Sequence, residues 1–174
     1  MKKIIVNFLP FAVAVTFLCG LVYIAVQQDL RLSANDPQIG IAEDTARLLD
    51  AGADLRAVVP GSSVDVATSV GTFVSVYDDK NLLVASSLSD QSLIPPAGVF
   101  EYARTHTEDV LTWQPKPGIR IAAVMVHHAS GFVLVGRSLR EVEMRERALL
   151  RDVLFAWIIT LIALFGSVWM KETA

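Results

Sequence analysis

The chain has 174 residues, of which 53% are hydrophobic, and a formal net charge of −3. Residues 27–152 carry 12 Lys and Arg against 17 Asp and Glu, and this acidic balance argues against nucleic acid as a partner. The only cysteine, Cys19, lies in an apolar segment, so we expect no disulfide.

Two uncharged segments predict membrane-spanning helices. Residues 4–26 and 153–170 are each long enough to cross a hydrocarbon core of about 30 Å, the second only just. The lipid bilayer is therefore the first expected partner. The alternative for the first segment is a cleaved signal peptide, but its apolar run is longer than usual and no small-x-small cleavage site stands out.

Basic residues predict the orientation of the two spans. Lys2 and Lys3 predict that the N-terminus, residues 1–3, is cytoplasmic. Lys171 predicts the same for the C-terminus, residues 171–174. The segment between the spans is then extracytoplasmic.

Small residues recur at helical spacing in both spans. Such residues let another helix approach closely, although they are also common in spans that pack against nothing. The candidate helix-packing residues are Ala12, Thr16 and Gly20 in the first span and Ala163 and Ser167 in the second.

We expect residues 27–34 to continue the first helix beyond the membrane. Asp36 is a suitable N-cap and Pro37 a suitable first residue for a second helix, which runs to about Ala51 and ends at Gly52. The inner face of that helix is predicted to hold Ile39, Ala42, Ala46 and Leu49. Residues 55–59 and 64–66 are either short strands or irregular.

The remaining pattern predicts an antiparallel sheet with one inserted helix. Apolar runs separated by polar turns indicate strands, and short connections make neighbouring strands antiparallel. The helix has Val99, Phe100 and Ala103 on its inner face. We therefore expect an α+β fold of about five strands. The expected elements are strands at 71–77, 82–86, 109–114, 119–127 and 132–136, and a helix at 97–105.

Two sequence segments resemble a known sensor fold. Phe73–Asp78 followed by Leu83–Ser87, and Val133–Leu139 at the end of the sheet, are similar to the PAS-like extracellular sensor fold called the Cache domain. The resemblance covers residues 29–152, and its motifs are loose. It implies that residues 27–137 form a sensor domain.

Three shorter motifs give a tighter resemblance. Ala34–Gln38, Thr112–Pro115 and Gly136–Glu143 look like those of a group of small, uncharacterised two-span bacterial membrane proteins. This resemblance implies the bacterial inner (cell) membrane and the two-span plan. It implies no activity.

A ligand site is predicted on the hairpin with a four-residue turn at 115–118. That turn places Trp113 opposite Arg120, and an arginine beside an indole can hold a carboxylate. The alternative is an arginine that lies over the ring for packing only. Hydroxyl groups expected to line a pocket between sheet and helix, or else to be ordinary residues at the core edge, belong to Tyr77, Ser86 and Tyr102.

No catalytic or metal-binding pattern stands out in the sequence. His127 and His128 are adjacent on a predicted strand, so their side chains point to opposite faces, and His106 lies elsewhere. No Ser/His/Asp arrangement with a supporting motif and no Gly-rich phosphate loop is present. We therefore expect no enzyme, no cofactor and no metal.

Residues 138–152 predict a juxtamembrane helix. Ser138 and Glu141 form a capping box. Leu139, Val142 and Leu149 fall at coiled-coil spacing. This helix is either a parallel homodimer seam that relays motion into the second span, or an amphipathic helix packed on its own domain.

The expected function is a membrane-anchored sensor or regulatory module. Because only residues 171–174 follow the second span, we expect it to act through a separate membrane signalling protein or through its own oligomerisation. One alternative is a structural or regulatory subunit that binds protein only, and another is a truncated sensor whose output domain is encoded separately. An apolar pocket with Arg120 at its mouth would favour the sensor. A filled core with an exposed apolar patch would favour the protein-binding subunit.

Overall fold

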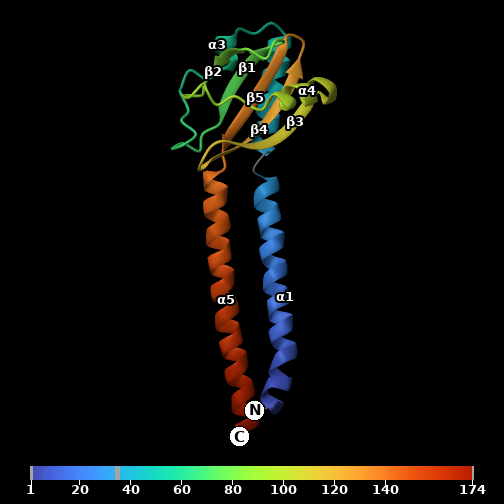
Figure 1. The fold of residues 1–174 in the computed structure, drawn as a ribbon, viewed down its shortest axis with the longest axis vertical. Coiled ribbons are helices and arrows are strands. Elements are labelled where there is room, and N and C mark those ends of the chain that lie inside the picture. The colour runs from blue at the N-terminus through green and yellow to red at the C-terminus, as the bar shows by residue number, and fades with distance from the viewer. Residues whose placement is uncertain (1, 34–35, 174) are drawn as a thin grey trace. The chain divides into compact units, whose positions relative to one another are not determined.

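A computed structural model describes residues 2–33 and 36–173 of the chain (Figure 1). The chain divides into two units, one of Met1–Arg31 with Glu143–Ala174 and one of Leu32–Val142. Two helices, α1 (Lys2–Leu32) and α5 (Arg140–Thr173), are long and apolar enough to cross a membrane. Their length and composition agree with the two predicted spans.

The first unit is a pair of helices, α1 and α5, that contact each other along their length. Trp157 Nε1 donates a hydrogen bond to Thr16 Oγ1 at 2.9 Å. The rings of Phe8 and Phe165 meet edge to face, with centroids 5.7 Å apart. Of the predicted packing residues, Thr16 takes part in this contact and Ala12 is half-buried, whereas the others are exposed within the described residues: Gly20, Ala163 and Ser167.

The second unit contains a five-stranded antiparallel sheet in the order β2-β1-β5-β4-β3. The strands are β1 (Phe73–Asp78), β2 (Leu83–Ser86), β3 (Glu108–Lys116), β4 (Ile119–His128) and β5 (Gly131–Ser138). The predicted α+β class and antiparallel sheet are therefore confirmed. Strands β1 and β5 are neighbours in the sheet, although β2, β3 and β4 all lie between them in the sequence.

Helix α2 (Asp36–Asp50) covers one face of the sheet, over β4 and β5. The predicted inner face is confirmed, since Ala42 and Ala46 are buried and Ile39 and Leu49 pack beside them. The predicted N-cap, the side chain of Asp36, lies outside the described residues. We call the cluster beneath this helix the α2-face core: Ala42, Ala46, Val74, Val124, Val126, Val133 and Val135.

Helix α4 (Ala97–His106) lies on the opposite face, together with two long loops. Its predicted inner face is confirmed, because Val99, Phe100 and Ala103 are buried. The cluster on this side is larger and contains most of the aromatic rings of the domain. We call it the α4-face core: Val66, Phe73, Tyr77, Leu88, Leu93, Val99, Phe100, Ala103, Ile121, Ala123, Met125, Phe132 and Leu134.

The segment between α2 and β1 contains a short helix, α3 (Leu55–Val58), where the sequence left short strands or irregular structure open. Asp54 caps this turn, since its carboxylate accepts a hydrogen bond from the Arg56 backbone N–H at 2.9 Å. Further along, Val64 forms a single parallel bridge with Leu88. That bridge brings the segment after α3 alongside the segment after β2.

Candidate functional site

The β3–β4 hairpin differs from its prediction in register. Strand β3 extends to Lys116, which pairs with Ile119, and a register shift separates this pair from the pairing of Trp113 with Ile121. The turn is therefore shorter than the four residues expected. The predicted pairing of Trp113 with Arg120 is wrong.

The same register separates Trp113 and Arg120 onto opposite faces of the sheet. Ile119 and Ile121 both pack with Trp113 at the α4-face core. Because successive side chains on a strand point to opposite faces, Arg120 points to the face that α2 covers. The arginine and the indole therefore do not form a joint carboxylate clamp.

Aromatic rings fill the space where a pocket between sheet and helix was expected. Tyr77 is 3% exposed and Phe100 is 2% exposed. Phe100 meets Tyr77 and Phe132 edge to face, with ring centroids 5.1 and 5.3 Å away. Burial raises the pKa of Tyr77 to about 12. These contacts agree with a filled core at this position.

Of the other two predicted hydroxyl residues, Ser86 shares a neighbour with Tyr77, because both interact with the Ser75 side chain, whereas Tyr102 lies at the surface. Tyr102 is half exposed and stacks on His106, with ring centroids 4.0 Å apart. Ser86 shares a hydrogen bond of 2.7 Å with Ser75, on the neighbouring strand. The structure thus connects Ser86 and Tyr77 through Ser75, and it places Arg120 and Trp113 on opposite faces of the sheet.

A groove of about 470 Å³ lies between α3 and β2, and Ser86 is the one predicted residue that lines it. Figure 1 shows α3 and β2 at the same edge of the sheet. One wall comes from α3 and the turn after it, and the other from β2 and the loop after it. The lining residues are Leu55, Arg56, Val59, Pro60, Gly61, Ser62, Ser63, Ala85, Ser86, Ser87, Leu88, Ser89 and Gln91.

Hydrogen bonds hold the two walls of this groove together. Ser63 and Ser89 share a hydroxyl hydrogen bond of 2.7 Å. The Val64 backbone N–H donates to the Ser87 carbonyl at 2.7 Å, and the Ser89 N–H donates to the Val64 carbonyl at 2.9 Å. The Ser87 hydroxyl accepts from a backbone N–H of β1. Most of the serines are therefore structural.

Three polar side chains that line the groove do not take part in the hydrogen bonds between its walls. Arg56, Ser62 and Gln91 are exposed. Within residues 2–33 and 36–173, the structure gives their side chains no hydrogen bond or ion pair. Arg56 is also the single charged residue among those that line the groove. The groove therefore presents one unpaired positive charge over a floor that is partly apolar.

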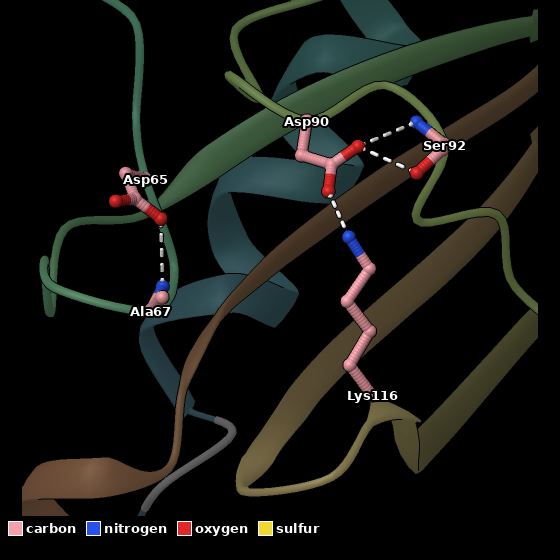
Figure 2. Close-up of polar contacts among 5 residues, drawn as sticks. All are labelled: Asp65, Ala67, Asp90, Ser92 and Lys116. Carbon is pink, nitrogen blue, oxygen red and sulfur yellow. Dashed lines mark hydrogen bonds and ion pairs between the residues drawn. The ribbon is translucent and has the colours of Figure 1, made fainter.

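A second polar cluster fastens the loop after β2 to the β3–β4 hairpin (Figure 2). Asp90 accepts hydrogen bonds from the Lys116 ammonium at 2.5 Å and from the Ser92 hydroxyl at 2.6 Å. These bonds, the one from Lys116 first, lower the pKa of Asp90 to about 2. The Asp65 carboxylate, in the same view, accepts hydrogen bonds from its own loop, from the Ala67 N–H and the Thr68 hydroxyl. The cluster closes a loop over the α4-face core.

The predicted histidines make separate contacts. His128 is buried, and its Nδ1 lies 3.1 Å from Asp50 Oδ1, which also accepts the Ala129 N–H at 3.0 Å. The bond from Ala129, followed by the contact with His128, lowers the pKa of Asp50. This carboxylate joins the end of α2 to the β4–β5 turn. Among the described residues, no group of three or more His, Cys, Asp or Glu is placed to hold a metal ion.

The start of α5 is packed against its own domain. Ser138 Oγ accepts a hydrogen bond from the Arg140 N–H at 3.4 Å, a long cap. Leu139 and Val142 are 9% and 7% exposed. At these two positions the packing agrees with the amphipathic helix that packs on its own domain. Leu149 belongs to the other unit and is half-buried.

Comparison of the chain with protein-family models, with curated proteins and with solved structures finds no match.

Proposed function

We propose that this protein is a regulatory sensor module of the bacterial inner membrane, with both termini cytoplasmic and an extracytoplasmic domain of PAS-like fold. The sheet order, in which the first and last strands lie side by side, supports the PAS-like assignment together with the sequence resemblance. The flanking lysines support the orientation. The module acts on a separate membrane protein through its two helices.

The continuity of α5 carries the proposal. Strand β5 ends at Ser138, and α5 begins at Arg140 and continues to Thr173 without interruption. A helix of 34 residues is about 50 Å long, and no loop lies within it to absorb a movement. Because Val142 is buried in the domain, a shift of the last strand moves the start of the helix as well.

Contacts between α1 and α5 would carry such a movement to both spans. Arg31 and Glu146 form an ion pair at 2.7 Å. The hydrogen bond from Trp157 to Thr16 lies further along the same pair. A change in one helix therefore alters the surface that the pair presents to a third membrane helix.

A second candidate function is a subunit that binds protein only. The filled core around Phe100 favours it, because the space where a small ligand was expected holds aromatic rings. In this case the signal would be the presence of the partner protein itself.

The test places a photoreactive residue in α5 of the full chain in bacterial membranes. Ile162 is 67% exposed and reports contacts with other membrane proteins. Leu161, which is half-buried, is the matched control for contact within the pair. We expect a discrete larger adduct from Ile162 and none from Leu161. Adducts with lipid alone at Ile162 would contradict a membrane-protein partner.

A helix break tests the coupling itself. Leu149→Pro removes a backbone donor inside α5 and costs about 3 kcal/mol or more of helix stability, whereas Leu149→Ala keeps the helix. We expect the Ile162 adduct to be lost or displaced by the proline and retained with alanine. Identical adducts in both variants would show that α5 continuity does not matter.

A further inference from the structure

Strand β2 is an edge strand that carries neither a charged residue nor proline. Natural proteins block exposed edges with charged residues, proline or bulges. The other edge strand, β3, contains Glu108, Asp109, Pro115 and Lys116 and a register shift. The sequence of β2, Leu-Val-Ala-Ser, offers no such side-chain block. Its protection is limited to its four-residue length and to a register shift in its pairing with β1, which leaves Val84 without a partner residue on β1.

Apolar side chains on and beside β2 are exposed. Val84 is 51% exposed, and Leu82, directly before the strand, is 62% exposed. Alternate residues of an edge strand also turn their N–H and C=O groups away from the sheet. This edge therefore offers backbone hydrogen bonds and apolar contacts together.

Directly beyond the end of β2, the same edge already pairs with another segment of the chain. Val64 bonds to Ser87 and Ser89 in a single parallel bridge, directly after β2 ends at Ser86. The edge of β2 itself borders the groove beside α3. Four residues of β2 correspond to an extended length of about 13 Å, the length of a four-residue peptide strand.

The charge on the groove indicates the partner's chemistry. Arg56 supplies the single positive charge of the lining in a domain with more acidic than basic residues. The hydroxyl of Ser62 and the amide of Gln91 add hydrogen-bonding groups to the same wall. A segment that fits carries a carboxylate for Arg56 and alternating apolar residues for the groove floor.

We propose that the groove between α3 and β2 receives an extended acidic peptide segment of a partner protein, which adds as a strand to the free edge of β2 and pairs a carboxylate with Arg56. The inference rests on the proposed regulatory function, because the groove would be the extracytoplasmic surface at which the partner protein binds. Backbone pairing provides affinity, and the charge of Arg56 provides selectivity.

The test uses a display library of random eight-residue peptides against the full chain in lipid nanodiscs. We expect enriched peptides to alternate apolar residues and to contain Asp or Glu. Val84→Lys places a charge on the edge and should abolish their binding, whereas Val84→Thr, which keeps β propensity, should retain it. Because Val84 is exposed, both variants should fold.

Charge variants separate this groove from general surface attraction. Arg56→Glu should weaken peptide binding about tenfold, because an attraction is replaced by a repulsion, and rising salt should weaken wild-type binding. Arg56→Lys should retain most of it. The matched control is Arg47→Glu on α2, an exposed arginine outside the groove, which should leave peptide binding unchanged.

Three outcomes would overturn the proposal. The library yields no binder, the binders lack acidic residues, or binding is indifferent to both Arg56→Glu and Val84→Lys. A concentration-dependent dimer that Val84→Lys abolishes would instead make this edge an interface between two copies. Because the photoadduct from Ile162 reports on the membrane helices, failure at the groove leaves the proposed function separately testable.

Discussion

Replacing Phe100 by alanine tests whether the α4-face core is as filled as its contacts indicate. The ring is 2% exposed and contacts both Tyr77 and Phe132 edge to face. Truncating a fully buried phenylalanine costs about 3–5 kcal/mol, because transfer free energy is lost and a cavity is left. Each aromatic pair accounts for about 0.5–1.5 kcal/mol of the loss. For a domain stable by about 5–15 kcal/mol, this is a large fraction.

The assay is urea denaturation of the full chain in detergent micelles. Trp113 packs against the α4-face core and reports its unfolding by fluorescence. Trp157→Phe and Trp169→Phe in every variant remove the signal from the helix pair. Tyr102→Ala is the matched control on the same helix, since that side chain is 49% exposed, and it should cost less than about 1 kcal/mol.

The result that refutes the reasoning is a loss below about 1 kcal/mol for Phe100→Ala, or one equal to that of Tyr102→Ala. Either would mean that the ring does not support the core. That result would favour a small-molecule pocket between the sheet and α4 over the candidate function of binding protein only.

Three further variants test contacts on both faces. Asp50→Asn should lower the thermal midpoint at pH 7, because the carboxylate accepts the Ala129 N–H. Since the pKa of Asp50 is lowered in the folded state, the difference in midpoint between wild type and variant should shrink as the pH falls below about 4. A difference that stays constant with pH would contradict this role of the carboxylate. Lys116→Gln should raise the pKa of Asp90 from about 2 toward 3.8 in a carboxyl NMR titration, whereas an unchanged value would assign the shift to other bonds. Gly136→Ala should cost about 1–3 kcal/mol of unfolding free energy, since its Cβ would lie 2.8 Å from a ring carbon of Phe73 and 2.9 Å from the Cβ of Ala123. A neutral effect would show that both neighbours move aside.

Periodicity made the helices predictable. In α2 and α4 the apolar residues recur at helical spacing, and one side of each helix packs on the sheet. Strand existence was also predictable, because the turn residues interrupt long apolar runs. α3 was not, since a helix of four residues is too short for a periodic signal and depends on the cap from Asp54.

The predicted pairing of Trp113 with Arg120 was wrong because of a one-residue difference in strand register. The turn is shorter than expected, and the Lys116–Ile119 pairing continued without a shift would place Ala122 opposite Trp113, on the same face as Arg120. The register shift between Trp113 and Lys116 places Ile121 there instead. A register shift of one residue changes which side chains share a face of the sheet. The position of such a shift depends on the hydrogen bonds of the folded chain, so the sequence pattern alone does not predict it. The groove was missed because residues 55–63 and 85–91 meet through one bridge, between Val64 and Leu88, which no local pattern indicates.

The filled core and the exposed edge of β2 both favour recognition of a protein segment at the surface over recognition of a small ligand in the interior. A domain without a disulfide depends on its buried apolar surface for stability, and here Phe73, Phe100 and Phe132 are all fully buried on one face. An internal cavity large enough for a ligand would remove part of that surface. Recognition at the edge of β2 uses groups that folding leaves exposed, so binding there need not weaken the core. For this reason we expect variants at Val84 and Phe100 to separate binding from stability.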